Sequence, residues 1–539
     1  SFGEYLAARR IVRAIEKVIR DLDRRTKEPD EGWDEKDALK YWVQICGPND
    51  ISEYLHVFLL NEMKLHSSEL EEWQSLLARL FNYVLQHGMP MEQLQIRTFK
   101  EAAFQSRNAE EALLVILNAC SRLSNKESII ENDIPNKFGA WFRRIQGQRI
   151  GMNSVLAFNC LSFLDLSGAV LDIGDFFHSN FHHSKLQGMR ASGACFIRTN
   201  FTNADLRESI IEGANFLYAD LEGANLFDAV LKGANLEKAN LKKAILEKAN
   251  LERANLERTI LKDANLERAN LERANLKKTN LERANLERSI LQYANLEKAN
   301  LERANLKSAI LEDAKLQGAN LQYANLEDAN LEGVILEGAR LRDAKLNKAN
   351  LGRANLKEAD LQYAILKGVK LLDANLEGAI LESANLEGAI LEGATLKGAH
   401  LNWAHLEDAK LEKANFEDAD LEGGKLKGAI LDGANLKGAN LKWAKLEDAK
   451  LGGTNLEGAN LEEAILKGAN LNGANLKGGN LKGADLKDAK LEGTNLEGAN
   501  LLDAKLEGAI FERAILKGAI LEEAILKWAI LKGAIIECL

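Results

Sequence analysis

Histidines are the side chains that come closest to forming a metal-binding cluster in this sequence. His178, His182 and His183 fall in one short segment, and neutral imidazole is a common metal ligand. No cysteine or acidic side chain joins them at metal-site spacing. His400 and His405 form a still weaker pair. We therefore expect no metal site.

Motifs that would carry catalysis are missing from the sequence. No Gly-x-x-x-x-Gly-Lys-Ser/Thr segment occurs, and the Gly-Gly-Lys-Leu segment at 423–426 belongs to a repeat pattern. Neither Cys-x-x-Cys nor His-Glu-x-x-His is present, and the five cysteines are too scattered for a disulfide framework. Cys538 is penultimate, which does not match a prenylation motif. We expect no enzymatic activity and no cofactor.

The composition points to repetition rather than to several ordinary domains. Of the 539 residues, 46% are hydrophobic but only 6% are aromatic, and the net charge is -10. No uncharged apolar run is long enough to cross a membrane, and no polybasic stretch suggests a nucleic-acid partner. No secretory signal opens the sequence. We therefore expect a cytoplasmic protein that binds neither membrane nor nucleic acid.

The first 150 residues differ from the rest. All four prolines lie here, and apolar residues such as Ile11, Ile15 and Ile19 recur at helical spacing. Segments around Pro48 and Pro90 read as breaks between helices. This pattern predicts a small all-α domain at 1–150, with about six or seven helices.

From about residue 156 a large apolar residue recurs every five positions, from Leu161 to Ile536, with a small residue two places before it. Five residues advance a helix by about 140°, which would spread the leucines around its whole surface. On a straight strand they would alternate between faces. The leucines all point inward only if the chain turns a corner every five residues, so we predict a β-solenoid at 151–539.

Units such as Ala234-Asn235-Leu236-Glu237-Lys238 and the segment 434–438 resemble the A(N/D)LXX unit of the pentapeptide-repeat family over about 156–536. The resemblance implies a mainly β fold, a right-handed quadrilateral β-helix with 20 residues per coil. Leucine and alanine would then fill the interior and leave no substrate cavity. Residues 20 apart would stack, so an amide ladder is expected at Asn235, Asn255, Asn275 and Asn295.

Two surface patterns follow from the 20-residue coil. One column alternates lysine and glutamate from Lys357 to Glu537, which we interpret as a stabilising ridge. Another column carries aromatic residues spaced by 40, which predict a contact face for a protein partner. The alternative interpretation is that duplication of a 40-residue segment copied them without a function. These residues are Tyr323, Tyr363, Trp403 and Trp443.

Near the end of the sequence, isoleucine replaces asparagine at outward-facing positions of six consecutive repeats. These are the candidate self-association residues Ile510, Ile515, Ile520, Ile525, Ile530 and Ile535. Exposed solenoid edges invite pairing with another chain, so we predict a homo-oligomer joined through this end. A truncated or frayed end is the alternative interpretation.

The segment Ser1-Phe2-Gly3-Glu4-Tyr5-Leu6-Ala7-Ala8 resembles an element of NACHT-type STAND ATPases that follows the nucleotide-binding module. The resemblance implies that this chain is the C-terminal sensor arm of a signalling or defence ATPase whose Walker motifs lie upstream of Ser1. The leading hypothesis is thus a non-enzymatic protein-interaction scaffold. The alternatives are a self-assembling rod or filament and a DNA mimic that binds gyrase, as in quinolone-resistance pentapeptide proteins.

Overall fold

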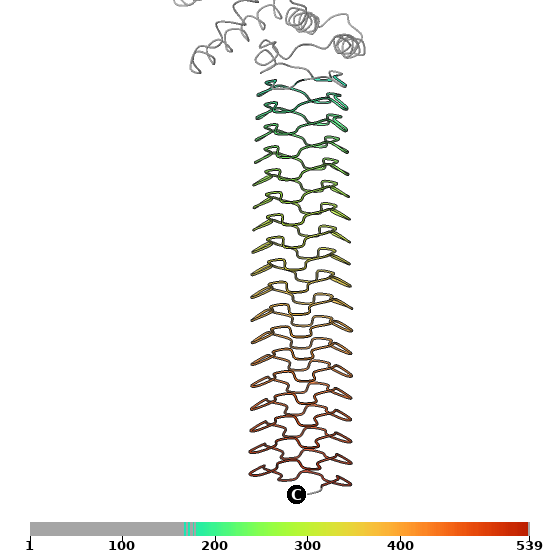
Figure 1. Cartoon of the computed structure of the whole chain (residues 1–539), viewed down its shortest axis with the longest axis vertical. Coiled ribbons are helices and arrows are strands. Elements are labelled where there is room, and N and C mark those ends of the chain that lie inside the picture. Colours follow the sequence, from blue (N-terminus) through green and yellow to red (C-terminus); the bar gives the residue numbers. More distant parts are fainter. Residues whose placement is uncertain (1–166, 169–170, 173–175, 177–178, 537–539) are drawn as a thin grey trace, which may run out of the picture. The chain divides into compact units, whose positions relative to one another are not determined.

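The computed structural model describes residues 167–168, 171–172, 176 and 179–536 (Figure 1). The predicted all-α domain at 1–150 and His178 lie outside these residues. The chain divides into two compact units, Ser1–Ala229 and Val230–Leu539, called here the first and second units. In the described residues of each unit the backbone winds into regular coils, as the period of five predicts.

Each coil contains 20 residues, because residues 20 apart form parallel β-bridges. The bridges run from Asn180↔Asn200 to Asp205↔Asn225 in the first unit and from Val230↔Asn250 to Ile515↔Ile535 in the second. The described residues contain no helix, and each strand is reduced to a single bridging residue. Four five-residue repeats therefore make one coil, which confirms the predicted four-sided β-helix.

Backbone hydrogen bonds connect each coil to the next. The N–H of Leu236 donates to the carbonyl of Asn255 at 2.7 Å, and the N–H of Asn255 donates to the carbonyl of Ala234 at 2.9 Å. The pattern repeats along the second unit, so interior backbone groups are paired despite the shortness of the strands. Among the described residues, no helix has the length and apolar character that a membrane crossing requires.

A tight turn forms each corner of the coil. Counting the repeat from its leucine, positions 2 and 3 form the turn, and the N–H at position 4 donates to the leucine carbonyl, as from Ala239 to Leu236 at 3.0 Å. Position 3 has a positive φ, near 57° at Lys238, as a type II turn requires. Position 5 supports the turn from outside, because Asn235 Oδ1 accepts the N–H of Glu237 at 3.2 Å.

The core consists of the leucines at position 1 and the alanines at position 4, whose exposed fractions are 0–2% wherever a coil lies on both sides. Phenylalanine takes the leucine position in part of the first unit, where Phe181 and Phe201 stack with centroids 4.9 Å apart. Threonine can replace alanine because its hydroxyl finds a carbonyl, as from Thr454 Oγ1 to Leu431 at 2.8 Å. The second unit is therefore a filled column, and its chemistry lies on the outside.

Candidate interaction surface

The aromatic column consists of Tyr323, Tyr363, Trp403 and Trp443 on one corner of the second unit. All four occupy position 3 of the turn, with φ of 59°. Their exposed fractions are 49%, 47%, 49% and 40%, respectively. A left-handed backbone is unfavourable for a bulky side chain. The turn nevertheless projects each ring away from the core, and the rings recur on every second coil.

Neighbouring side chains hold three of these rings in place. The guanidinium of Arg303 lies 5.3 Å from the centroid of Tyr323, and that of Arg342 lies 5.5 Å from the centroid of Tyr363. Trp443 Nε1 donates a hydrogen bond to Glu463 Oε2 at 2.9 Å. Cation–π and hydrogen-bond contacts of this kind restrict ring motion, so the column presents ordered rings.

Trp403 is placed differently, because its indole lies against Gly423 on the next coil. A Cβ built on Gly423 would clash with Cε3 and Cζ3 of the indole. Sequence reasoning missed this role of Gly423, although a tryptophan and a glycine 20 residues apart were visible in the sequence. The glycine provides the flat surface on which the ring rests.

Gly423→Ala should therefore destabilise its coil more than an alanine in an open turn does. Gly423 and Gly453 both have a φ of +64°, but a Cβ on Gly453 would meet nothing within 4 Å. Both alanines carry the left-handed penalty of about 1 kcal/mol. Only Gly423→Ala must also displace Trp403, which adds about 1 kcal/mol.

Native-state hydrogen exchange of amides in the coils around each site measures the two local opening free energies. Equal losses for Gly423→Ala and Gly453→Ala would show that Trp403 does not rest on Gly423.

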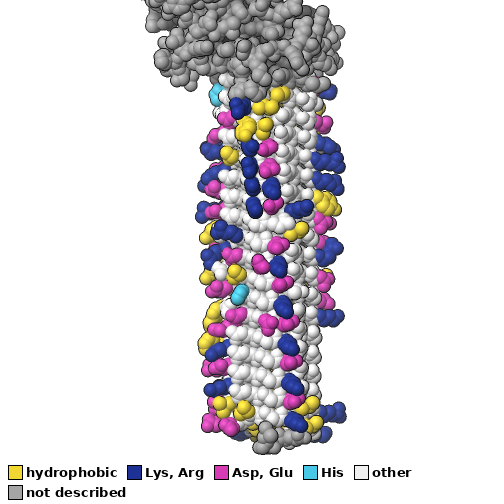
Figure 2. All heavy atoms as spheres, in the orientation of Figure 1, with side chains coloured by type: hydrophobic (Ala, Val, Ile, Leu, Met, Phe, Trp, Pro, Cys, Tyr) yellow, Lys and Arg dark blue, Asp and Glu magenta, His cyan; other side chains and the backbone are white. Residues whose placement is uncertain are grey.

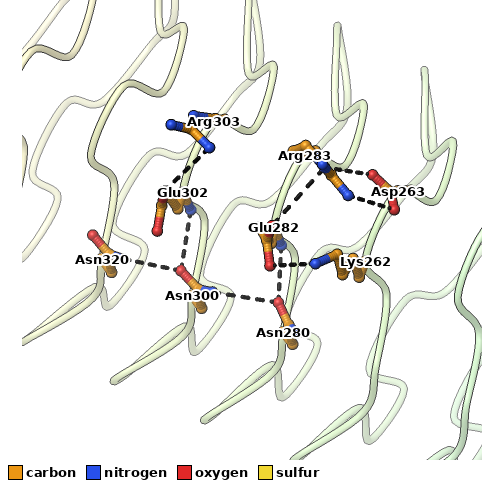
Figure 3. A network of polar contacts seen from close by, with 9 residues as sticks. All are labelled: Lys262, Asp263, Asn280, Glu282, Arg283, Asn300, Glu302, Arg303 and Asn320. Carbon is orange, nitrogen blue, oxygen red and sulfur yellow. Dashed lines mark hydrogen bonds and ion pairs between the residues drawn. The ribbon is translucent and has the colours of Figure 1, made fainter.

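On the same corner, nearer the start of the second unit, charged side chains form a paired network (Figure 3). Arg283 makes two hydrogen bonds to Asp263, at 2.7 and 3.0 Å. The hydrogen bond from Arg283 lowers the pKa of the Asp263 carboxyl below its ordinary value. Lys262 Nζ lies 2.9 Å from Glu282. Beside these charges, Asn300 Nδ2 donates to Asn280 Oδ1 at 3.4 Å as part of an amide ladder.

Charges of both signs are interspersed along the face in view in Figure 2. In the alternating ridge, Lys357 Nζ lies 3.4 Å from Glu377, and Lys437 Nζ lies 3.4 Å from Glu457. The expected amide ladder is also present, because Asn255 Nδ2 donates to Asn235 Oδ1 at 3.1 Å and Asn275 repeats the contact with Asn255 at 3.0 Å. Exposed ion pairs contribute little individually, so each of the two lysine–glutamate pairs adds only a small amount to the stability of the coils.

The isoleucines near the end of the second unit lie on its outer surface. Ile510 is partly buried, and the exposed fractions of Ile515, Ile520, Ile525, Ile530 and Ile535 are 36%, 46%, 47%, 45% and 51%. Trp528 is 75% exposed in the same coils, and Lys527 Nζ lies 4.1 Å from the centroid of its ring. Sequence reasoning missed Trp528. These side chains form an apolar surface.

The described histidines do not form a metal-binding cluster. The rings of His182 and His183 have centroids 4.1 Å apart, and burial lowers the pKa of His182. His405 Nε2 lies 2.9 Å from Lys425 Nζ. Within the ranges that the structure describes, no three His, Cys, Asp or Glu side chains form a group that could hold a metal ion.

The family model for pentapeptide repeats matches segments of the chain that together cover residues 175–478 and 480–537. A search of curated proteins found no match. Among solved structures, the chain is similar to HetL, a pentapeptide repeat protein involved in heterocyst differentiation regulation from the cyanobacterium Nostoc sp. strain PCC 7120. The identity is 36%, the alignment covers 44% of this chain and 89% of HetL, and the TM-score is 0.19.

Two further structures are similar at lower identity. A pentapeptide repeat protein of the Arabidopsis thaliana thylakoid lumen is 28% identical, with 23% of this chain and 68% of that chain covered and a TM-score of 0.15. Full-length QnrB1, a plasmid-mediated fluoroquinolone resistance protein, is 16% identical, with 35% and 90% covered and a TM-score of 0.14.

Proposed function

Because this chain belongs to the pentapeptide-repeat family, whose fold is the right-handed quadrilateral β-helix, we propose that it is a non-enzymatic protein-interaction scaffold. The aromatic column carries the proposal, since it presents four rings with exposed fractions of 40–49% on one corner of the second unit. Exposed tyrosine and tryptophan are the side chains most enriched in protein interfaces. Coils that contact only their neighbours hold such rings at fixed intervals.

We prefer a protein-binding scaffold to a DNA mimic that binds gyrase. A DNA mimic must present dense, unneutralised negative charge, because a duplex carries one charge per about 1.7 Å. Here acidic side chains of the second unit pair with cations, as Glu417 does with Lys397 at 3.2 Å and Glu497 with Lys477 at 3.2 Å.

The proposal is tested with a photo-reactive amino acid placed between the rings of the aromatic column. Ser383 lies at position 3 between Tyr363 and Trp403. The chain is produced in cells of the organism that encodes it, with the photo-reactive amino acid in place of Ser383. Irradiation of these cells should yield a covalent adduct between the chain and a protein. The adduct should fall several-fold when Trp403→Ser is added, because the ring contributes to the interface.

Ser308 is the matched control position. It is also a position-3 serine, with φ of 54° against 56° for Ser383, but it lies on a different corner. No adduct is expected from a probe at Ser308. An adduct yield at Ser383 no higher than at Ser308 would contradict the proposal.

A second candidate function is self-assembly into a rod or filament through the outward isoleucines near the end of the second unit. The observation that favours it is the exposed fraction of Ile520, Ile525 and Ile535, which is 46–51%. Ile525→Asn restores the residue type that other repeats carry, and it should lower the average mass measured by light scattering. An unchanged mass would count against this surface as an association site.

We also propose that the scaffold is the sensor arm of a NACHT/STAND-type ATPase. The support is the segment 1–8 alone, which lies outside the described residues. The gene sequence upstream of the Ser1 codon tests the sensor-arm proposal, because a P-loop is expected there. Absence of a P-loop from the complete reading frame would contradict this proposal.

A further inference from the structure

Exposed rings and recessed residues alternate along the corner that carries the aromatic column. The rings are exposed, whereas Asp343 and Ser383 on the coils between them are partly buried. Gly423 is buried beneath the indole of Trp403. Protrusions and gaps therefore alternate from Tyr323 to Trp403. A surface of this shape can accept a copy of itself, because the rings of one copy fit the gaps of the other.

We propose that the partner of the aromatic column is a second copy of this chain, packed antiparallel along the same corner about a twofold axis. This inference rests on the proposed scaffold function. A twofold axis makes every contact occur twice, with the same patch used on both copies. In the register that places Tyr363 opposite Ser383 of the second copy, Trp403 faces Asp343, so these two rings each enter a gap. Tyr323 faces Gly423, where it would meet the Trp403 indole that covers this glycine.

The charges on this corner are complementary in the same register. Lys243 faces Asp503. Arg283 faces Glu463, although Arg283 also pairs with Asp263 and Glu463 also accepts the Trp443 hydrogen bond within each copy. Arg303, which lies over Tyr323 in its own copy, faces Trp443. The side chains of Lys243, Arg283, Arg303, Glu463 and Asp503 are all exposed. Opposite charges at matching heights stabilise one alignment of the two copies.

Like charges disfavour the neighbouring alignments. Sliding one copy by a single coil places Asp263 opposite Asp503 in one direction and opposite Glu463 in the other, and the pairing of Asp263 with Arg283 offsets part of this repulsion. In the proposed register Asp263 faces Gly483 instead. Specificity of this kind combines attraction in the correct alignment with repulsion in the wrong ones.

The position-2 residues beside the corner add little net charge, because they are paired within one copy. Lys262 lies 2.9 Å from Glu282, and Lys442 lies 3.3 Å from Glu462. The contact from Lys243 to Asp503 spans about 60 Å at the spacing of β-strands. A strip of that length reaches the roughly 800 Å² per partner of a stable interface if it is about 13 Å wide.

Sedimentation equilibrium on the full 539-residue chain tests the pairing with a charge swap. The unmodified chain should be a dimer at micromolar concentration. Lys243→Asp and Asp503→Lys should each raise the dimer Kd about tenfold, because each change turns two attractive contacts into repulsive ones. The double variant should return the Kd to within about threefold of the original, since the swap restores both pairs.

Lys248→Asp is the matched control, because Lys248 is also an exposed lysine at position 3, with φ of 59° against 58° for Lys243, on another corner. Its Kd should stay near that of the unmodified chain. A monomeric unmodified chain would overturn the pairing, as would a double variant as weak as Lys243→Asp or an equally weak Lys248→Asp. An adduct at Ser383 with a different protein would overturn the pairing while leaving the scaffold function standing.

Discussion

Leu436→Ala is expected to lower the local stability of the second unit by about 3–4 kcal/mol. The Leu436 side chain is 0% exposed and stacks between Phe416 and Leu456, which are also buried. Its backbone is fixed to the next coil by the hydrogen bond from its N–H to the carbonyl of Asn455 at 2.6 Å. The surrounding walls therefore cannot collapse into the space that the leucine leaves, and the full cavity penalty remains.

The adjacent residue provides the control. Lys437 is 52% exposed and pairs with Glu457 at 3.4 Å, so Lys437→Ala should cost less than about 1 kcal/mol. Native-state hydrogen exchange of amides in the coils above and below Leu436 measures both effects. Similar losses for Leu436→Ala and Lys437→Ala would refute the filled core.

Asn455→Ala is expected to cost about 2 kcal/mol, because one side chain makes three hydrogen bonds. Its Nδ2 donates to Asn435 Oδ1 at 3.0 Å, and its Oδ1 accepts from Asn475 Nδ2 at 3.1 Å. The same Oδ1 accepts the N–H of Glu457 at 3.3 Å. The substitution therefore interrupts the amide ladder and removes the outer support of one turn.

Lys445→Ala tests whether the loss comes from the amide. Lys445 occupies the same position of the repeat and bridges to Ile465 through its backbone, but lysine cannot continue an amide ladder. Its replacement should change the local opening free energy by less than about 0.5 kcal/mol. The ladder would have no stabilising role if Asn455→Ala and Lys445→Ala gave the same exchange rates.

The interior of the β-helix was predictable because the constraint on it is simple. A period of five leaves one way to bury every leucine, and Leu236 and Leu436 are both buried as that argument requires. The number of sides did not follow from the period and came from the family resemblance. The bridge from Asn235 to Asn255 confirms it. Stacking of residues 20 apart then placed the amide ladder and the aromatic column correctly.

The turn was not predictable from residue types. A positive φ usually indicates glycine, yet position 3 here is more often another residue, including Arg258 and Trp403. The hydrogen bonds of the coil impose the positive φ at position 3, so the conformational propensities of the residue types do not predict it. The contact between Trp403 and Gly423 and the exposure of Trp528 depend on side-chain orientation, which the one-dimensional pattern does not contain.

Because the chain turns a corner after every fifth residue, its interior has a period of five residues and its surface has a period of twenty. Gain or loss of a single repeat preserves the period of five, so every later leucine still enters the core. The same event shifts the period of twenty and moves all later outward residues to the adjacent side. Removing one repeat between Trp403 and Trp443, for example, would separate these two rings by a quarter turn. Slippage of whole repeats can thus recombine surface patterns while the interior stays the same.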